Sequence, residues 1–246
     1  MNPPRALLID FGGTLDVPRH WLDRFLNHYR AAGVAIDRAR LDCAFSHATQ
    51  LGYASSAELR QAALDEIVGF LVHHQFDWLQ RNPTQHNLEF ASLSPSSRVM
   101  LERSICDGFV DESREATGST RELLRDLHDR YRIAVVSNFY GNLRVILDEC
   151  GFMDFIDAAV DSSAVGIFKP DPALFLIAMR ELGIGPVDTA MVGDSLGKDL
   201  APARRLGLRT VWLRHSLPGD RDGIEDRELA ADYLIRSITD LRDLRW

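Results

Sequence analysis

The run Ala6-Leu7-Leu8-Ile9-Asp10-Phe11-Gly12-Gly13-Thr14-Leu15-Asp16 decides the fold of this chain. Its apolar start predicts a short buried strand, and the glycine pair after Asp10 predicts that this strand breaks into a tight turn. The stretch therefore places an acidic side chain at the carboxyl end of a buried strand.

Strands and helices alternate over the second half of the chain. Helical patterns cover 120–130, 142–150, 171–182 and 199–206, and apolar runs cover 133–136, 158–160, 189–192, 210–213 and 232–235. Ser119 is the expected N-cap of the first of these helices. Alternation of this kind predicts an α/β protein with a Rossmann-like, doubly wound parallel sheet.

The stretch from 18 to 115 has a different sequence pattern, with apolar residues at helical spacing and few glycines. We expect an all-helical cap domain over 18–115, inserted into a core made of 1–17 and 116–246. Its aromatic residues are expected to pack inside the cap: Trp21, Phe25, Tyr29, Phe70, Phe76 and Trp78.

The polar residues of the insert are expected to have ordinary roles. Its histidines are interpreted as helix-surface or packing residues: His20, His28, His47, His73, His74 and His86. Its arginines are expected to be solvated: Arg19, Arg24, Arg30, Arg60, Arg81, Arg98 and Arg103.

Composition limits the partners. The 246 residues carry a net charge of -8 without a dominant basic patch, which argues against nucleic acid as a partner. We expect no signal peptide and no membrane span, hence a cytoplasmic protein, and the oligomeric state stays open between monomer and dimer. Cys43, Cys106 and Cys150 are odd in number and widely spaced, so they are expected to be reduced, buried thiols.

Polar residues stand at three predicted strand ends, namely Asp10 with Thr14, Ser137 with Asn138, and Asp194 with Asp199. Ligands of open parallel sheets bind beyond the carboxyl ends of the strands, so these residues are expected to converge. Two carboxylates and a loop carbonyl suit Mg²⁺, which prefers oxygen ligands.

Lysine occurs at only two positions of the chain. Lys169 precedes Pro170-Asp171-Pro172, and Lys198 lies between Asp194 and Asp199. Since arginine's planar fork cannot imitate a compact ammonium, we expect Lys169 to be functional. For Lys198, a functional role and a solvated surface role both stay open.

With these motifs in this order, the chain resembles the haloacid dehalogenase superfamily of hydrolases over about residues 5–17 and 116–240. The resemblance implies that Asp10 is a nucleophile forming an aspartyl intermediate, with Thr14 as its helper. It further implies that Ser137, Asn138 and Lys169 bind the phosphoryl group. Asp10, the Gly12 carbonyl and Asp194 would then hold Mg²⁺, with Asp199 in support.

The first motif departs from the phosphatases of that superfamily, in which the second position after the nucleophile is an Asp that acts as acid and base. Here that position is Gly12, which keeps the carbonyl and lacks the carboxylate. General acid–base assistance contributes roughly 10²–10⁴ in rate. Asp16 is the nearest replacement in sequence, and a turn-stabilising or solvated role for Asp16 is the competing interpretation.

Three functions follow. We expect first a Mg²⁺-dependent phosphoryl hydrolase for a small phosphorylated metabolite with a good leaving group. The alternatives are a catalytically deficient binding or regulatory protein, and a hydrolase like the 2-haloacid dehalogenases, which also lack the second Asp. The Schiff-base chemistry of the superfamily's phosphonatases is excluded, because the insert contains no lysine.

Overall fold

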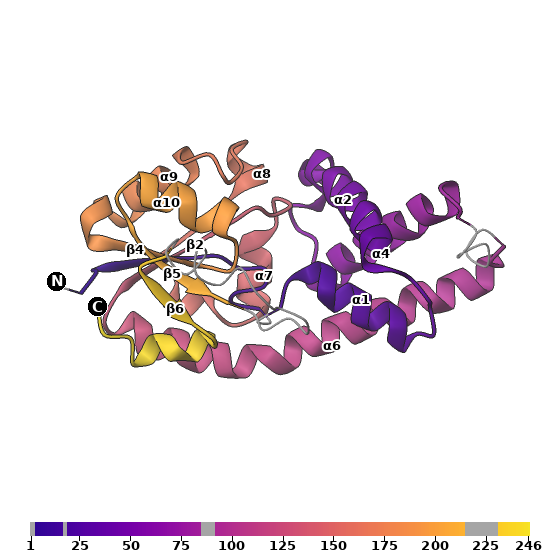
Figure 1. The fold of residues 1–246 in the computed structure, drawn as a ribbon, viewed down its shortest axis with the longest axis horizontal. Helices are drawn as coiled ribbons and strands as arrows, with labels where there is room; N and C mark the ends of the chain where they lie inside the picture. The colour runs from indigo at the N-terminus through magenta and orange to yellow at the C-terminus, as the bar shows by residue number, and fades with distance from the viewer. Residues whose placement is uncertain (1–2, 17–18, 85–91, 215–230) are drawn as a thin grey trace.

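The computed structural model describes residues 3–16, 19–84, 92–214 and 231–246. Figure 1 shows a sheet with flanking helices at one end of an elongated molecule and a group of helices at the other. The sheet end carries the core, and the helical end is the cap expected from the sequence.

The core contains a six-stranded sheet in the order β3-β2-β1-β4-β5-β6, and every pair of neighbours is parallel. The central strand β1 aligns Leu7 with Ile133 on one side and with Ala190 on the other. The strands are β1 (Ala6–Ile9), β2 (Arg132–Ser137), β3 (Ala158–Asp161), β4 (Thr189–Gly193), β5 (Arg209–Leu213) and β6 (Tyr233–Ile235). The predicted doubly wound parallel sheet is confirmed.

Strand β1 is buried on both faces, which explains its unbroken apolar sequence. Successive side chains of a strand point to opposite faces. Leu7 and Ile9 accordingly join the apolar cluster that contains Leu124 and Leu147, whereas Leu8 joins the cluster that contains Leu174 and Ala203.

Helices therefore cover both faces of the sheet (Figure 1). One face is covered by α9 (Ala173–Leu182) and α10 (Ala201–Arg205), and the other by α7 (Leu143–Glu149) and the end of α6 (Pro95–His128). The shorter elements are α8 (Ser162–Val165), η1 (Met153–Phe155), η2 (Pro186–Asp188), the π-helical turn η3 (Leu196–Leu200) and η4 (Ile238–Arg242).

The cap consists of helices packed around a shared apolar interior. Its elements are α1 (Trp21–Ala31), α2 (Arg38–Ala54), α3 (Ser56–Leu59), α4 (Leu64–Arg81) and the first half of α6. Phe25, Tyr29 and Phe76 are fully buried, as the sequence predicted for the cap interior. His86 lies outside the described residues.

Helix α6 corrects one expectation. The sequence predicted that a helix begins near Thr120 with Ser119 as its N-cap, but α6 runs without a break from Pro95 to His128, with Ser94 as its N-cap. Its 34 residues extend about 50 Å, so one helix passes beneath both the cap and the core (Figure 1). Gly118 did not end the helix because Leu123, Leu124 and Leu127 bury the last turns against the core. The proposed boundary between 115 and 116 thus falls inside a helix.

The cysteines are free, but they are less buried than expected. Cys43 is exposed, and Cys106 and Cys150 are half-buried. The expectation of buried thiols is wrong for Cys43 because it lies on the outward face of α2, whose buried positions include Leu41, Ala44 and Ala48. Within the described ranges, no helix is both long and apolar enough to span a membrane.

Candidate active site

The site is built around Lys169, whose ammonium group lies between two carboxylates. Lys169 Nζ is 2.6 Å from Asp10 Oδ1 and 2.6 Å from Asp199 Oδ1, and it also donates to the Val136 carbonyl at 3.1 Å. Burial by itself lowers the pKa of Lys169, but the two carboxylates outweigh burial and raise this pKa above its usual value. The ammonium therefore stays charged beside Asp10.

The ends of β1 and β2 hold Asp10 and Lys169 in place. Ser137, the last residue of β2, donates from Oγ to Asp10 Oδ1 at 3.0 Å. Asn138 follows it and makes a paired contact with the backbone of Lys169, accepting from its N–H at 2.7 Å and donating to its carbonyl at 3.0 Å. Asn138 thus positions the lysine, while Ser137 contacts the aspartate.

Carboxylate oxygens of Asp10, Asp194 and Asp199 all lie within 4.8 Å of one another. Both oxygens of Asp199 accept hydrogen bonds, Oδ1 from Lys169 and Oδ2 from the Ser195 N–H at 3.1 Å. Burial raises the pKa of Asp199, the charges of Asp10 and Asp194 add to this effect, and Lys169 opposes it. Three carboxylates against one ammonium leave an excess of negative charge, and a divalent cation with oxygen ligands fits such a set.

The absence of a side chain at Gly13 leaves room for the Asp194 carboxylate. Gly13 has a φ of +81°, and a Cβ placed there would lie 2.7 Å from Asp194 Oδ2. Any other residue would both strain the backbone and displace Asp194. Gly12 differs, because a Cβ there would lie 3.4 Å from Trp21 Nε1, which is an ordinary contact.

Thr14 is a predicted site residue that does not face the cavity beside Asp10. Its side chain is 1% exposed, its Oγ1 has no hydrogen-bond partner among the described residues, and it is not among those that line the cavity next to Asp10. It lies in the turn after β1, where Thr14 N donates to the Phe11 carbonyl. Asp10, Gly12, Ser137, Asn138, Lys169, Asp194 and Asp199 all line that cavity.

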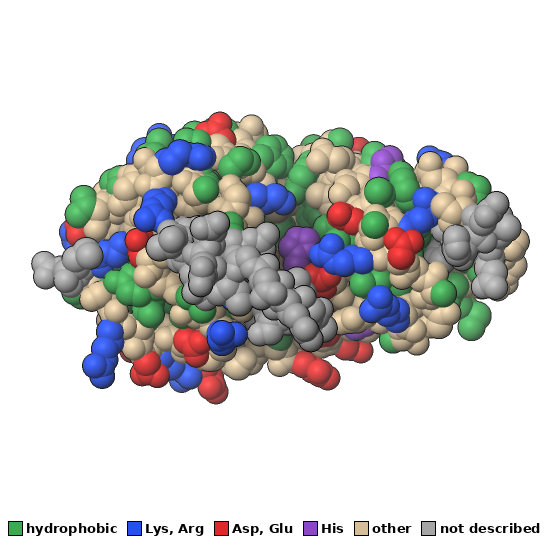
Figure 2. Space-filling view, viewed as in Figure 1, with side chains coloured by type: hydrophobic (Ala, Val, Ile, Leu, Met, Phe, Trp, Pro, Cys, Tyr) green, Lys and Arg blue, Asp and Glu red, His purple; other side chains and the backbone are tan. Residues whose placement is uncertain are grey.

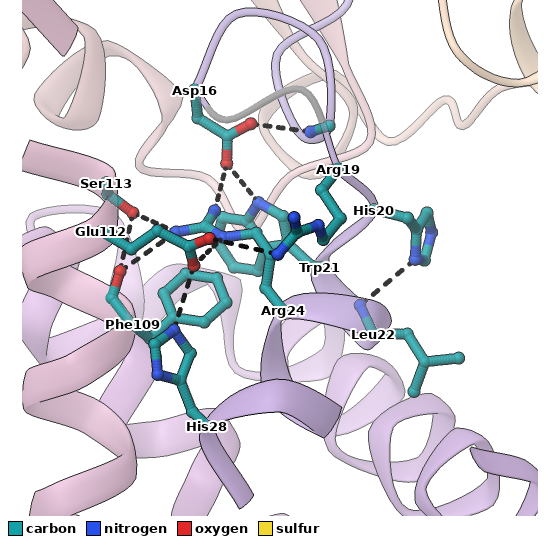
Figure 3. A network of polar contacts seen from close by, with 11 residues as sticks. Asp16, Arg19, His20, Trp21, Leu22, Arg24, His28, Phe109, Glu112 and Ser113 are labelled. Carbon is teal, nitrogen blue, oxygen red and sulfur yellow. Dashed lines mark hydrogen bonds and ion pairs between the residues drawn. The ribbon is translucent and has the colours of Figure 1, made fainter. Parts of the chain in front are cut away.

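Asp16 holds the turn instead of facing the cavity. Its Oδ1 accepts from the Gly13 N–H at 2.7 Å, and its Oδ2 accepts from the Trp21 indole and from Arg24 Nη1 (Figure 3). Of the two interpretations of Asp16, the turn-stabilising one fits these contacts. The carboxylate is buried, however, and not solvated.

Arg24 corrects a further expectation, since its side chain is completely buried. Its guanidinium bonds to Asp16, to Glu112 at 3.0 Å and to the Phe109 carbonyl at 3.0 Å, and lies 3.6 Å above the Phe109 ring (Figure 3). The sequence predicted a solvated arginine because its partners Glu112 and Phe109 lie about ninety positions along the chain and are brought near only by α6.

A cavity of about 150 Å³ lies between the sheet edge and the cap. Acidic, basic and histidine side chains gather where the two lobes meet (Figure 2). The cap lines the cavity with His20, Trp21, Phe45, Thr49 and Tyr53. His20 and Trp21 are therefore more than surface and packing residues, and Lys198 lines the same cavity from the core.

Sequence reasoning missed the contribution of α2. Phe45, Thr49 and Tyr53 are spaced four residues apart, so they share one face of the helix. That spacing was visible in the sequence, but nothing in it showed that this face meets the sheet edge.

Asp161 at the end of β3 is a second missed residue. It accepts from the backbone N–H groups of Gly141, Leu143 and Ser163 at 2.8–3.0 Å. Burial raises the pKa of Asp161, and these backbone donors oppose that rise. The contacts order the loop after β2, which places Phe139 and Tyr140 in the cavity wall.

Comparison with known proteins agrees with this geometry. The haloacid dehalogenase-like hydrolase family matches residues 4–207. The chain belongs to this family and has the hydrolase fold and strand-end residues predicted from the sequence.

Its relatives include phosphatases. It is 27% identical over 215 residues to ribulose-1,5-bisphosphate 5-phosphatase of Halopiger xanaduensis, covering 82% of this chain and 88% of that protein. It is 30% identical over 139 residues to glyceraldehyde 3-phosphate phosphatase of Pyrococcus furiosus, where the match covers 53% of this chain and 54% of the relative. The chain thus spans about half the length of the second relative.

Solved structures repeat the whole fold. A dehalogenase captured with an intermediate aligns over 98% of this chain and 96% of its own, with a TM-score of 0.63 and 18% identity. The L-2-haloacid dehalogenase PA0810 aligns over 98% and 97%, with a TM-score of 0.55 and 20% identity. At this identity the likeness concerns the fold, cap included.

Proposed function

We propose that this protein hydrolyses a small phosphorylated metabolite through a phosphoaspartyl intermediate on Asp10, with Mg²⁺ as cofactor. One observation carries the proposal, namely the ammonium group of Lys169 at 2.6 Å from both Asp10 and Asp199. The relatives named for phosphatase activities support the same reaction class.

Asp10 is the nucleophile in this proposal. Ser137 and Lys169 both bond to Oδ1, so Oδ2 is the oxygen available to attack phosphorus. The new Oδ2–P bond forms as the bond from phosphorus to the leaving oxygen breaks. Water then attacks the same phosphorus, which releases inorganic phosphate and restores the Asp10 carboxylate.

Phosphoryl transfer mainly requires positive charge at the site, because negative charge is spread over the phosphoryl oxygens in the transition state. Lys169 supplies one fixed cation, and Ser137 with Asn138 stands next to the transferring group. Asp10, Asp194 and the Gly12 carbonyl would hold the metal, supported by Asp199. When bound, Mg²⁺ supplies the positive charge that offsets the three carboxylates and the phosphoryl oxygens.

The test uses acetyl phosphate, p-nitrophenyl phosphate and 2-chloropropionate, each with Mg²⁺ or with EDTA. We expect metal-dependent phosphate release that is lost in Asp10→Asn. Chloride release without metal would instead identify a dehalogenase. Inactivity on all three, with phosphate still bound, would identify a binding protein of this fold.

A further inference from the structure

The cavity beside Asp10 has two chemically different walls. The core wall carries the carboxylates and both lysines, whereas the cap wall is mainly aromatic. The lining residues from the cap are His20, Trp21, Phe45, Thr49 and Tyr53. A phosphoryl group held at the core wall therefore directs the rest of the substrate against aromatic rings.

The aromatic wall is continuous across the two domains. Tyr53 of α2 stacks on Tyr140 with ring centroids 5.3 Å apart, and Phe139 lies 5.2 Å from Tyr140 and 5.9 Å from Trp21. Gly52 permits this packing, since a Cβ there would lie 2.7 Å from the Tyr140 ring. The wall is thus held by ring contacts on both sides of the cavity.

The described cap residues that line the cavity include no lysine or arginine. Among the described residues that line the cavity, Lys169 and Lys198 are the cations, and both belong to the core. Arg24 of the cap is fully buried and forms ion pairs with Asp16 and Glu112. A carboxylate or second phosphate on the leaving group would face rings instead of a cation, at the cost of its hydration.

The carboxylate that would donate a proton to the leaving group is missing as well. Gly12 lines the cavity without a carboxylate. The Leu22 N–H donates to His20 Nδ1 at 3.2 Å, so this ring nitrogen is held at the start of α1. Burial raises the pKa of Tyr53 to about 12, which makes its hydroxyl a much weaker proton donor than a carboxyl group.

Taking the proposed phosphoryl hydrolysis as given, we infer that the substrate is a monophosphate whose leaving group is an uncharged aromatic ring bearing a weakly basic oxygen. A phenyl phosphate and a benzoyl phosphate share this chemistry. As the Asp10–phosphorus bond forms, the phosphorus–oxygen bond breaks and phenolate or benzoate leaves with the electron pair. Phenolate then takes a proton from water, and benzoate needs none.

The ionisation of the leaving oxygen explains this choice. A phenol has a pKa of about 10, as in tyrosine. An aliphatic alcohol resembles water, at about 16. Departure of the phenolate therefore depends far less on the acid that Gly12 cannot provide.

A matched substrate series tests the inference. Phenyl phosphate and cyclohexyl phosphate have the same carbon number, but only phenyl offers an aromatic ring and a weakly basic oxygen. We expect kcat/KM for phenyl phosphate to exceed that for cyclohexyl phosphate by at least about 100-fold. Adding a 4-carboxylate to phenyl phosphate should raise KM at least about tenfold. A comparison of benzoyl phosphate with acetyl phosphate tests the acyl phosphates separately from the phenyl esters. Equal rates for the phenyl and cyclohexyl esters would overturn the inference while leaving phosphatase function intact.

Binding provides a readout that does not require turnover. With Mg²⁺ present, phenylphosphonate should bind about tenfold more tightly than methylphosphonate by calorimetry. Phe45→Leu and Tyr53→Leu should reduce this preference, whereas Phe70→Leu changes a cap ring that contacts His74 outside the cavity and should preserve it. Equal affinity for the two phosphonates in the unaltered protein would contradict the aromatic site, whether or not any ester is hydrolysed.

Discussion

Arg24 Nη1 donates to Asp16 Oδ2 across 2.8 Å, and the two side chains are only 0% and 4% exposed. This ion pair joins the first helix of the cap to the turn that follows Asp10. Arg24 also reaches Glu112 on α6, so three segments that connect cap and core meet at one guanidinium (Figure 3). The position of Asp10 relative to the cap wall therefore depends on buried charges that contact no substrate.

Replacing Arg24 with Met should lower the free energy of unfolding by about 3–5 kcal/mol, because the buried Asp16 carboxylate would lose the positive charge that balances it. Urea denaturation measures this loss. The double variant Arg24→Met with Asp16→Asn should lose clearly less than the sum of the two single losses. Additive losses would show that the ion pair does not couple the two residues.

Glu112 should make stability depend on acid pH. Burial raises its pKa, but the His28 hydrogen bond and the charge of Arg24 outweigh burial and lower the pKa from 4.5 to about 2. A carboxyl group with a lowered folded-state pKa stabilises the protein above its unfolded-state pKa and loses that effect as pH falls toward the folded-state value. Glu112→Gln should therefore cost about 1–2 kcal/mol near neutral pH.

The measurement is the difference in urea-unfolding free energy between the unaltered protein and Glu112→Gln. This difference should shrink as pH is lowered from about 4.5 toward about 2. A difference that stays constant across that range would mean that the Glu112 charge does not contribute.

The two lysines offer a matched pair of substitutions. Lys169→Arg should lower kcat for phosphate release by about 10²–10³, because a planar guanidinium cannot occupy the buried position that lies 2.6 Å from both Asp10 and Asp199. Lys198→Arg, at an exposed position on the cavity, should have a much smaller effect. Stopped-flow phosphate detection compares them, and a fully active Lys169→Arg enzyme would contradict the role given to the ammonium.

Substitutions at Gly12 and at Gly13 should change activity in opposite directions. Gly12→Asp is expected to fold and to raise the turnover of alkyl phosphates by about 10²–10⁴, since its Cβ fits 3.4 Å from Trp21 and its carboxylate restores a proton donor. Gly13→Ala is expected to lose activity, since its Cβ would lie 2.7 Å from Asp194 Oδ2 at a φ of +81°. Phosphate release from cyclohexyl phosphate measures both, and an unchanged rate in Gly12→Asp would refute our account of Gly12.

Local patterns in the sequence were sufficient for the sheet, the helical cap and the convergence of Asp10, Lys169 and Asp194 at one edge. Each strand is a short apolar run ending at a polar residue, and parallel strands connected by helices bring their carboxyl ends to the same side. The missing carboxylate at Gly12 was equally visible, because a residue type is read without knowing its neighbours.

Only the tertiary structure decided which side chains meet across the domains. Thr14 sits apart from the cavity, Asp16 is held by Arg24, and the Phe45–Tyr53 face of α2 forms the wall opposite Asp10. The unbroken α6 contributes to the placement of Arg24 beside Asp16 by carrying Phe109 and Glu112 to its guanidinium. Periodicity shows which face of a helix is apolar, but the partner of that face depends on packing between residues far apart in the chain, which no local pattern encodes.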